Sequence, residues 1–465
     1  MGSSFIKKTG MIGLLIVLLN IPLGFISDTI EERSMRNGKA HMQIASTWGR
    51  AQGITGPVLT IPYYDSQGTL QHACFLSDTL DITAKISPEK RYRGIFEVIV
   101  YRAEISMSGT FGRPDFSAWD IESYQILWDK ATLTIGLNEL KGIQLISAFQ
   151  WNGNPAPLRP GEKTAPGIYG LAARLFPDRE PDTKSDSASS GFEDANRFNI
   201  VFNLHGSSEI RFAPTSDTTT VAVTSPWPHP SFQGSYLPVK RTITPEGFKA
   251  KWQVSGFGRD YPGQWNSEQK DAQKAANRLT NGMFGVKLIQ PVNFYTLSER
   301  SVKYALLIIT LTFLCFFMFE ILNRLKIHPM QYLLVGFSLS LFYLLLISFS
   351  EHIGFLPAYV LSAAACVVLI TWYARSFLGS SRSSLITGGV LSGFFALFYI
   401  ILQHEGYSLV MGTSSLFFIL ALVMGLTRKL DWYSVFKAAP GLKIPAFRSK
   451  RRPPTCNPMA EENEK

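Results

Sequence analysis

The sequence predicts a membrane protein of the α+β class. In it, a large extracytoplasmic all-β, sandwich-like domain lies between an N-terminal transmembrane anchor and a C-terminal bundle of five transmembrane helices. Two observations support this fold class. Six stretches are apolar over a length close to the roughly 20 residues that a helix needs to cross a bilayer. The long polar stretch between the first and the second of them shows the two-residue alternation that is typical of β-strands.

The chain therefore divides into four segments. Residues 1–26 form a signal anchor, 27–303 the β-rich domain, 304–426 the five-span bundle and 427–465 a basic cytoplasmic tail. The first span is expected at 9–26 and the others at 304–322, 331–349, 358–373, 385–403 and 408–426. A cleaved signal peptide is the alternative for the first span. No small-residue cleavage pattern follows its apolar run, so we expect an uncleaved anchor.

The positions of basic residues predict the orientation, because Lys and Arg near the ends of spans stay on the cytoplasmic side. Basic residues precede the first span, follow the second, separate the fourth from the fifth and follow the sixth: Lys7, Lys8, Arg324, Lys326, Arg375, Arg382, Arg428 and Lys429. Segments 350–357 and 404–407 contain none. Both termini are therefore expected in the cytoplasm. The domain at 27–303 is expected outside it, since long translocated domains are exempt from the charge rule.

Alternation of apolar and polar residues predicts many short strands in the domain. They are expected at 80–86, 96–101, 131–137, 198–204, 209–212 and 220–224, with a hairpin turn at 244–247. Two helical patches interrupt this pattern. Residues 29–49 continue the first span as a polar helix, and 267–279 form a surface helix. Residues 177–191 have no apolar period, so we interpret them as a flexible insertion.

Composition limits the classes of partner and of crosslink. The net charge of +10 would suggest nucleic acid in a small soluble protein. Here much of the excess lies beside membrane spans, where it sets topology and contacts anionic lipid head groups, so the bilayer is the expected partner and nucleic acid is not. Of the four cysteines only Cys74 falls within 27–303, which excludes a disulfide inside the domain. Cys74 is expected to be a buried small hydrophobe.

A few residues could form a site. Glu351 and His352 end the third span, and His404 and Glu405 end the fifth. Together these four side chains could form a metal or proton site if the helices were neighbours. The alternative, which we prefer, is that they are interfacial residues in wet loops.

Two further groups of residues invite interpretation. Trp227, His229 and Phe232 could make a small docking surface on the β domain, although His229 between two prolines also fits a rigid loop residue. Glu320 lies one helical turn before Arg324, which predicts an i,i+4 ion pair.

Sequence motifs of catalysis are missing. The chain contains no phosphate loop of the form G-x-x-x-x-G-K-[ST], no H-E-x-x-H, no C-x-x-C and no G-x-S-x-G. Ser338 resembles an intramembrane nucleophile with His404 as its base, but their predicted depths differ by roughly 18 Å. Proton transfer needs contact within about 3 Å. We therefore expect no catalytic residue, no cofactor and no resident metal.

Several strings resemble the CreD family of bacterial inner-membrane proteins. They occur in the family's order at 56–63, 91–98, 227–234, 247–252, 300–305, 327–336 and 341–346 followed by 350–352, and the resemblance covers about 30–426. It implies an inner-membrane protein linked to cell-envelope integrity, without established catalytic residues. The insertion at 177–191 and the tail beyond Arg448 depart from the family pattern.

Three function classes remain. The first is a non-enzymatic inner-membrane protein that supports cell-envelope integrity, with a periplasmic β domain that binds an envelope protein or polymer. The second is a transporter or exporter component that uses the C-terminal bundle, although the bundle shows no obvious inverted repeat. The third is an enzyme acting on envelope glycan or lipid, which would need two carboxylates facing a cleft. The resemblance and the missing motifs favour the first class.

Overall fold

The computed structural model describes residues 3–160, 168–176, 192–266, 272–290, 294–323, 325, 327–404 and 408–428, which fall into two compact units. The helical unit comprises Met1–Phe25, Arg300–Leu344 and Val360–Lys465, and the strand unit comprises Ile26–Glu299 and Leu345–Tyr359. The predicted insertion at 177–191, and the predicted tail after residue 428, lie outside the described residues.

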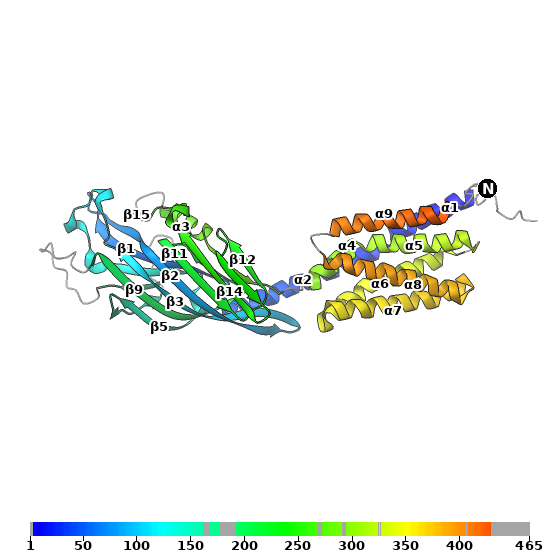
Figure 1. Ribbon diagram of the computed structural model, residues 1–465, viewed down its shortest axis with the longest axis horizontal. Coiled ribbons are helices and arrows are strands. Elements are labelled where there is room, and N and C mark those ends of the chain that lie inside the picture. Colours follow the sequence, from blue (N-terminus) through cyan, green and yellow to red (C-terminus); the bar gives the residue numbers. More distant parts are fainter. Residues whose placement is uncertain are drawn as a thin grey trace, which may run out of the picture. The chain divides into compact units, whose positions relative to one another are not determined.

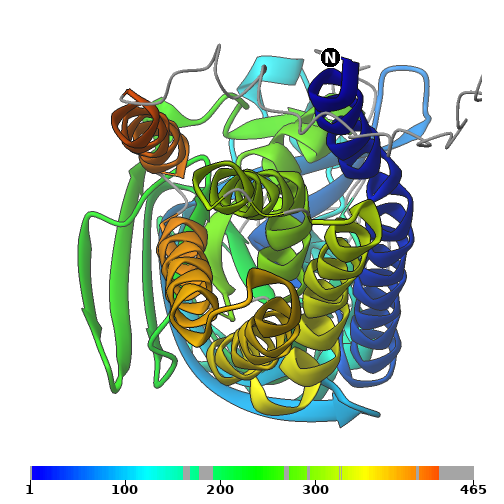
Figure 2. The ribbon, with the colours of Figure 1, turned by 90° about the vertical axis from the view of Figure 1, so that its right-hand side faces the viewer.

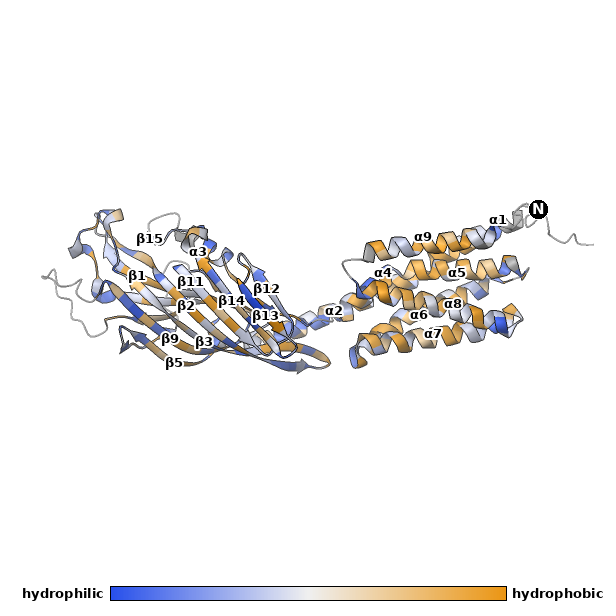
Figure 3. Cartoon of the chain, viewed as in Figure 1, coloured by the Kyte–Doolittle hydropathy of each residue, from blue (hydrophilic) through white to orange (hydrophobic). Residues whose placement is uncertain are grey.

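Apolar helices make up the helical unit, as expected from the lengths of the apolar runs. Their bounds are α1 Ser3–Leu18, α5 Ala305–Leu322, α6 Pro329–Ile353, α7 Phe355–Leu378, α8 Ser381–Gln403 and α9 Ser408–Thr427, with the start of α2 Asn20–Trp48. Figure 2 shows these helices nearly end-on, and the cartoon in Figure 3 colours most of their length as hydrophobic. The N-terminal apolar helix and several C-terminal apolar helices are therefore confirmed.

The apolar helices differ in length and straightness more than the sequence suggests. Among the described residues, four helices are long and apolar enough to cross a bilayer, namely Lys7–Trp48, Pro329–Ile353, Phe355–Leu378 and Ser381–Gln403. Helix α4 (Phe294–Lys303) and α5 qualify only as a pair, bent by 46°. The apolar part of α9, Val410–Gly425, is shorter than a full span. The expected count of five helices in the bundle stays a prediction.

Within the described part of the strand unit, sixteen strands form one hydrogen-bonded network (Figure 1). The main path runs β12-β16-β10-β1-β2-β3-β9-β5-β6. The bounds are β1 Gln52–Tyr64, β2 Leu70–Arg93, β3 Phe96–Gly112, β4 Thr132–Leu137, β5 Ile143–Trp151, β6 Asn154–Pro155, β7 Arg159–Pro160, β8 Gly170–Arg174, β9 Ala195–Ser207, β10 Glu209–Ala213, β11 Ser216–Ser225, β12 Pro230–Gly234, β13 Lys240–Thr244, β14 Gly247–Ser255, β15 Gln264–Asn266 and β16 Phe284–Leu288. The predicted strands and the hairpin turn at 244–247 are confirmed.

Strand β2 joins two groups of strands in this network, one that contains β1 and β15 and one that contains β3 and β11. Its first half pairs with β1 and β15, and its second half pairs with β3 and β11. The pairs β1–β10 and β2–β11 are parallel, whereas most others are antiparallel. Because one strand serves both groups, the network is continuous, and the strand-rich domain is confirmed while its sandwich geometry stays a prediction. Helix α3 (Ala272–Asn281) matches most of the predicted surface helix.

Alternating side chains of these strands build the core. In β9 and β14 buried and exposed residues alternate, as the two-residue period requires. The main cluster includes the fully buried rings of Trp252, Phe202, Phe212 and Phe284. Cys74 is buried in a second cluster, where burial raises the pKa of its thiol to about 12. The thiol is therefore protonated and unreactive at neutral pH.

The C-terminal end of α2 is fastened to the sheet by aromatic stacking. The Trp48 ring lies 4.1 Å from the His205 ring at an interplanar angle of 2°. Trp48 Nε1 donates to the Tyr101 carbonyl oxygen at 3.3 Å, and the Arg91 guanidinium lies 4.5 Å above the indole. Such cation–π contacts stabilise an aromatic ring by about 0.5–2 kcal/mol. The predicted polar helix at 29–49 thus forms and ends on β3 and β9.

Candidate ligand cavity

A cavity of about 920 Å³ lies within the strand unit, where a helix, a hairpin and three chain segments meet. Its walls are α2, the tip of the β2–β3 hairpin, the segment before β12, the end of β16 with the start of α4, and the last turn of α6. The hairpin tip turns at Gly94, whose φ of +61° suits glycine because it has no Cβ. This turn brings strand residues from both sides of the hairpin to the cavity.

Glu97 is the carboxylate of the hairpin wall. Its oxygens accept hydrogen bonds from Lys90 Nζ at 2.9 Å, from Gln290 Nε2 at 3.0 Å and from the Tyr92 hydroxyl at 3.2 Å. The hydrogen bond to Glu97 is the largest cause that raises the pKa of Lys90. Glu97 is thus held by three donors, and the charges of Lys90 and Glu97 cancel.

Glu351 is the carboxylate of the α6 wall. Its side chain is only 7% exposed. Oε1 accepts a hydrogen bond from the Tyr295 hydroxyl at 3.0 Å, and Oε2 lies 3.6 Å from Arg33 Nη1. A buried carboxylate needs such partners because an unpaired charge is costly away from water. The three residues come from α6, α4 and α2, so they fasten three helices at the edge of the cavity.

Four other cavity residues have no side-chain partner within the part of the chain that the structure describes. Lys287 Nζ and the rings of His41, His229 and His352 make no hydrogen bond or ion pair to any described residue. Burial lowers the pKa of His41 below its usual value. These four side chains come from β16, α2, the segment before β12 and α6. Their nitrogen atoms are therefore available to a ligand.

The predicted docking residues separate in the structure. Trp227 and His229 line the cavity, and Trp227 Nε1 donates to the Ile289 carbonyl oxygen at 3.0 Å. Phe232 instead packs edge-on against Phe248 and Trp252, with ring centroids 5.9 and 5.6 Å away. Its position on β12 directs it into the core, so it supports the sheet beneath the cavity wall.

The four residues of the predicted metal or proton site are likewise divided. Glu351 and His352 line the cavity of the strand unit, whereas His404 is exposed at the end of α8 in the helical unit. Glu405 lies outside the described residues. Within the described part of the chain, no group of three or more His, Cys, Asp or Glu side chains is placed to hold a metal ion. The cavity thus unites one predicted pair with most of the predicted docking surface.

The predicted ion pair of Glu320 has different partners among the described residues. Glu320 forms an ion pair with Lys8 of α1 and accepts a hydrogen bond from the Tyr332 hydroxyl at 3.2 Å. Lys8 Nζ also donates to the Ile327 carbonyl oxygen at 2.8 Å. Arg324, the expected partner, lies outside the described residues. A contact between residues more than 300 positions apart leaves no periodic signal in a sequence.

Ser338 packs between helices of the helical unit. Its hydroxyl lies 3.7 Å from Cys366 Sγ of α7, and its side chain is buried. The neighbouring Ser340 hydroxyl donates to the Gly336 carbonyl oxygen at 3.1 Å within α6. Small polar residues at such positions let helices approach closely.

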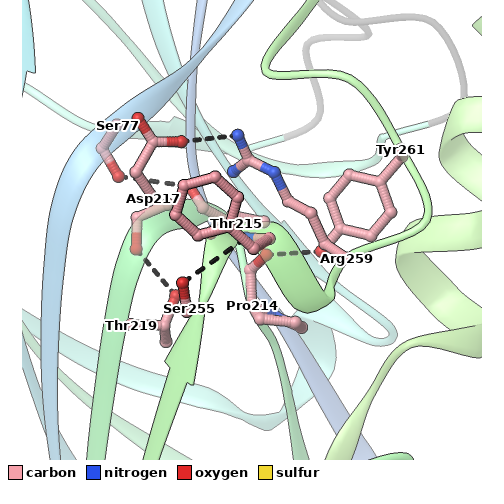
Figure 4. Close-up of polar contacts among 10 residues, drawn as sticks. Ser77, Pro214, Thr215, Asp217, Thr219, Ser255, Arg259 and Tyr261 are labelled. Atoms are coloured by element: carbon pink, nitrogen blue, oxygen red, sulfur yellow. Dashed lines mark hydrogen bonds and ion pairs between the residues drawn. The ribbon is translucent and has the colours of Figure 1, made fainter.

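A second polar cluster lies at the start of β11 and in the turn before β15 (Figure 4). Arg259 Nη2 lies 2.6 Å from Asp217 Oδ1, and the Ser77 hydroxyl donates to the Thr215 carbonyl oxygen at 3.2 Å. The Tyr261 hydroxyl donates to the Pro214 carbonyl oxygen. Because these bonds join β2, β11 and the turn to one another, we interpret the cluster as structural and the cavity as the stronger candidate site.

Sequence reasoning did not single out Arg33, Tyr295, Lys90 or Lys287. Each is an ordinary polar residue in its own segment. Only the fold brings Lys90 and Lys287 to one cavity, and Arg33 and Tyr295 to the Glu351 carboxylate at its edge. The pattern Tyr92-Arg93-Gly94-Ile95-Phe96 does mark a turn between strands, which is a local signal for the hairpin tip.

Apolar helices long enough to span a bilayer, joined to a large strand-rich domain, define a multi-pass membrane protein. The family described as inner membrane protein CreD matches residues 4–433, so the chain belongs to the CreD family. It is 29% identical over 441 residues to the inner membrane protein CreD of Escherichia coli (strain K12), a match that covers 92% of this chain and 94% of that protein. The resemblance expected from the sequence strings is confirmed, and the chain is an inner membrane protein. The family is named for its location and not for a reaction.

Proposed function

We propose that this protein is a non-enzymatic support of cell-envelope integrity, whose strand unit lies in the periplasm and binds an envelope partner through the cavity. The observation that carries the proposal is the convergence of Trp227, His229, Glu351 and His352 on one cavity of about 920 Å³. That volume is in the range of ligand sites, which are usually 300–1,000 Å³. Several side chains that line it have no partner among the described residues, as a binding site requires.

The charge asymmetry of the sequence supports a periplasmic strand unit with both termini in the cytoplasm. Reporter enzymes fused after Ser185 and after Ile327 test this orientation. A reporter active only in the periplasm should work after Ser185 and fail after Ile327. The opposite pattern would contradict the orientation, and with it the access of the cavity to periplasmic partners.

A transporter or exporter component is the second candidate. The Lys8–Glu320 pair supports it, because ionisable residues in membrane helices are often functional. The cavity between α5, α8 and α9 offers less support, since it holds only about 30 Å³ between mostly apolar side chains. This space suits one or two water molecules. We therefore place the envelope-binding function first.

The function is tested by complementation of an envelope-integrity defect in a bacterium that lacks its own CreD protein. The double variant His229→Ala/His352→Ala removes two exposed cavity side chains and should lose most of the complementation at normal abundance on a blot. His404→Ala, an exposed histidine of the helical unit, is the matched control and should complement fully. Full complementation by the double variant would contradict the cavity as the functional site. Loss with His404→Ala alone would favour the metal or proton site instead.

A further inference from the structure

The charges around the cavity point to the sign of its ligand. Both carboxylates are engaged, Glu97 by Lys90 and Glu351 by Arg33, so neither leaves a net negative charge. The ammonium group of Lys287 has no anionic partner among the described residues. Its positive charge and the N–H groups of nearby histidines remain to be satisfied. This set of charges and donors favours an anionic ligand, because charge-assisted hydrogen bonds to a phosphate or carboxylate are about twice as strong as neutral ones.

The walls of the same cavity are partly aromatic. Tyr92 and Phe96 of the hairpin, Trp227 before β12 and Phe294 of α4 line it together with the polar groups. Tyr92 is 64% exposed, so a large part of its ring is available to a ligand. Aromatic walls beside unpaired donors suit an amphipathic ligand, which has an anionic part and an apolar part. A small hydrated anion would leave most of this volume and these rings without contact.

The position of the cavity along its helices indicates where such a ligand resides. Glu351 and His352 lie in the last turn of α6, immediately after the predicted span at 331–349. Arg33, which pairs with Glu351, lies about two helical turns, or roughly 10 Å, beyond the predicted end of the first span. Head groups occupy a layer of several ångströms outside the hydrocarbon core. One wall of the cavity is therefore at head-group level.

From these observations we propose that the cavity binds the phosphate-bearing head group of a membrane amphiphile. Lys287 and His229 contact the phosphate, and the aromatic side chains contact the glycerol and the first carbons of the acyl chains. The proposal rests on the proposed function, since it names the chemical class of the envelope partner. An inorganic phosphate ion could supply the same anionic chemistry, so the test compares both sources.

Native mass spectrometry of the full-length protein in mild detergent tests the assignment. The protein is titrated with phosphatidylglycerol, with a diacylglycerol of the same chains, and with inorganic phosphate. Phosphatidylglycerol should bind, and Lys287→Gln should weaken it roughly tenfold, the size expected for one charge-assisted hydrogen bond. Lys249→Gln makes the same charge change on an exposed residue of β14 and should leave binding unchanged.

Three results would overturn the proposal. These are equal binding of the phospholipid and the diacylglycerol, equal weakening by the two lysine variants, and binding of inorganic phosphate as strong as that of phosphatidylglycerol. The last result would assign the site to a free anion. Because this experiment uses purified protein, its failure is distinct from a failure of complementation. Normal lipid binding together with full complementation by His229→Ala/His352→Ala would contradict only the proposed function.

Discussion

The N-terminal helices α1 and α2 carry the same chemistry in different surroundings, α1 in the helical unit and most of α2 in the strand unit. In α1, Lys8 pairs with Glu320 of α5, which also accepts a hydrogen bond from Tyr332. In α2, Arg33 pairs with Glu351 of α6, which also accepts a hydrogen bond from Tyr295. In each triad a carboxylate near a helix C-terminus meets one cation of an N-terminal helix and one tyrosine hydroxyl.

The positions of the two cations along the sequence explain why each helix can use a charge. Lys8 precedes the predicted span at 9–26 and Arg33 follows it, so both cations lie outside the apolar stretch. Helix α1 is thus fastened to α5 within the helical unit, and α2 is fastened to α6 within the strand unit.

The difference between the triads lies in what surrounds them. Lys8 Nζ also holds the Ile327 carbonyl oxygen, and the Lys8 and Glu320 side chains are 25% and 12% exposed. Arg33 is 40% exposed, and Glu351 borders the cavity. At Lys8 the triad holds two helices together, because the ammonium group binds both the Glu320 carboxylate and the Ile327 carbonyl oxygen. At Arg33 the same kind of triad borders a cavity whose lining includes donors without a partner among the described residues, which is why we propose a binding site there.

The largest effect is expected for the substitution Lys8→Met. It leaves Glu320 without its cation, and breaking a buried ion pair costs 3–5 kcal/mol; partial exposure reduces this to roughly 2 kcal/mol. The apparent melting temperature in detergent should fall by several degrees. Adding Glu320→Gln in the same chain should restore part of the loss, because no unpaired charge then remains. A Lys8→Met protein with the same melting temperature as the wild type would contradict the stabilising role of the Lys8–Glu320 pair.

A smaller effect is expected for Arg33→Met. Arg33 is more exposed than Lys8, so water screens its attraction to Glu351, and the Tyr295 hydroxyl remains as a donor. The expected loss is about 1 kcal/mol. A double-mutant cycle with Glu351→Gln measures the coupling between the two side chains. A loss of stability larger than that of Lys8→Met would show that the Arg33–Glu351 pair, and not the Lys8–Glu320 pair, contributes more to the stability of the protein.

The smallest effect concerns pH. Burial lowers the pKa of His205 and of His41, and nearby Arg102 contributes at His205. The unfolded chain, with an ordinary histidine pKa near 6.5, therefore binds protons at higher pH than the folded chain. The stability from these histidines is present above about pH 6.5 and is lost as the pH falls below it.

Thermal melts at pH 7.5 and pH 5.5 measure this dependence. The melting temperature should be lower at pH 5.5. The substitution His205→Phe, which keeps a ring against Trp48, should flatten the difference. An increase in stability on acidification, or an unchanged pH dependence in this variant, would contradict the assignment.

The sequence predicted where helices and strands occur better than it predicted which of them pack or pair with one another. The strands at 80–86 and 220–224 were identifiable because alternation is a local property. That these two strands pair in parallel was not identifiable, because register depends on segments more than 100 residues apart. Helix α4 and its bend against α5 were also missed, since residues 294–303 carry three charged side chains and were placed in the β-rich domain, with the second span beginning at 304.

The candidate site shows the same division. Trp227, His229, Glu351 and His352 were named from the sequence because aromatic residues in loops and charges at the ends of spans are unusual locally. The sequence assigned them to two separate sites, and the structure places all four on one cavity. Phe232, named with the docking residues, is partly buried and packs against the core cluster, because strand direction decides which face a side chain occupies.

The sequence by itself thus determined the apolar helices, the strand-rich domain and the membership of the CreD family, because apolar length, alternation and motif order are written along the chain. Only the tertiary structure decided that Arg33, Tyr295 and Glu351 meet, and that Lys287 lines the same cavity as Glu351 without an ion-pair partner among the described residues. The physical reason is that the environment of a charge depends on which distant segments surround it. That environment forms only when the sheet and the helix ends come together.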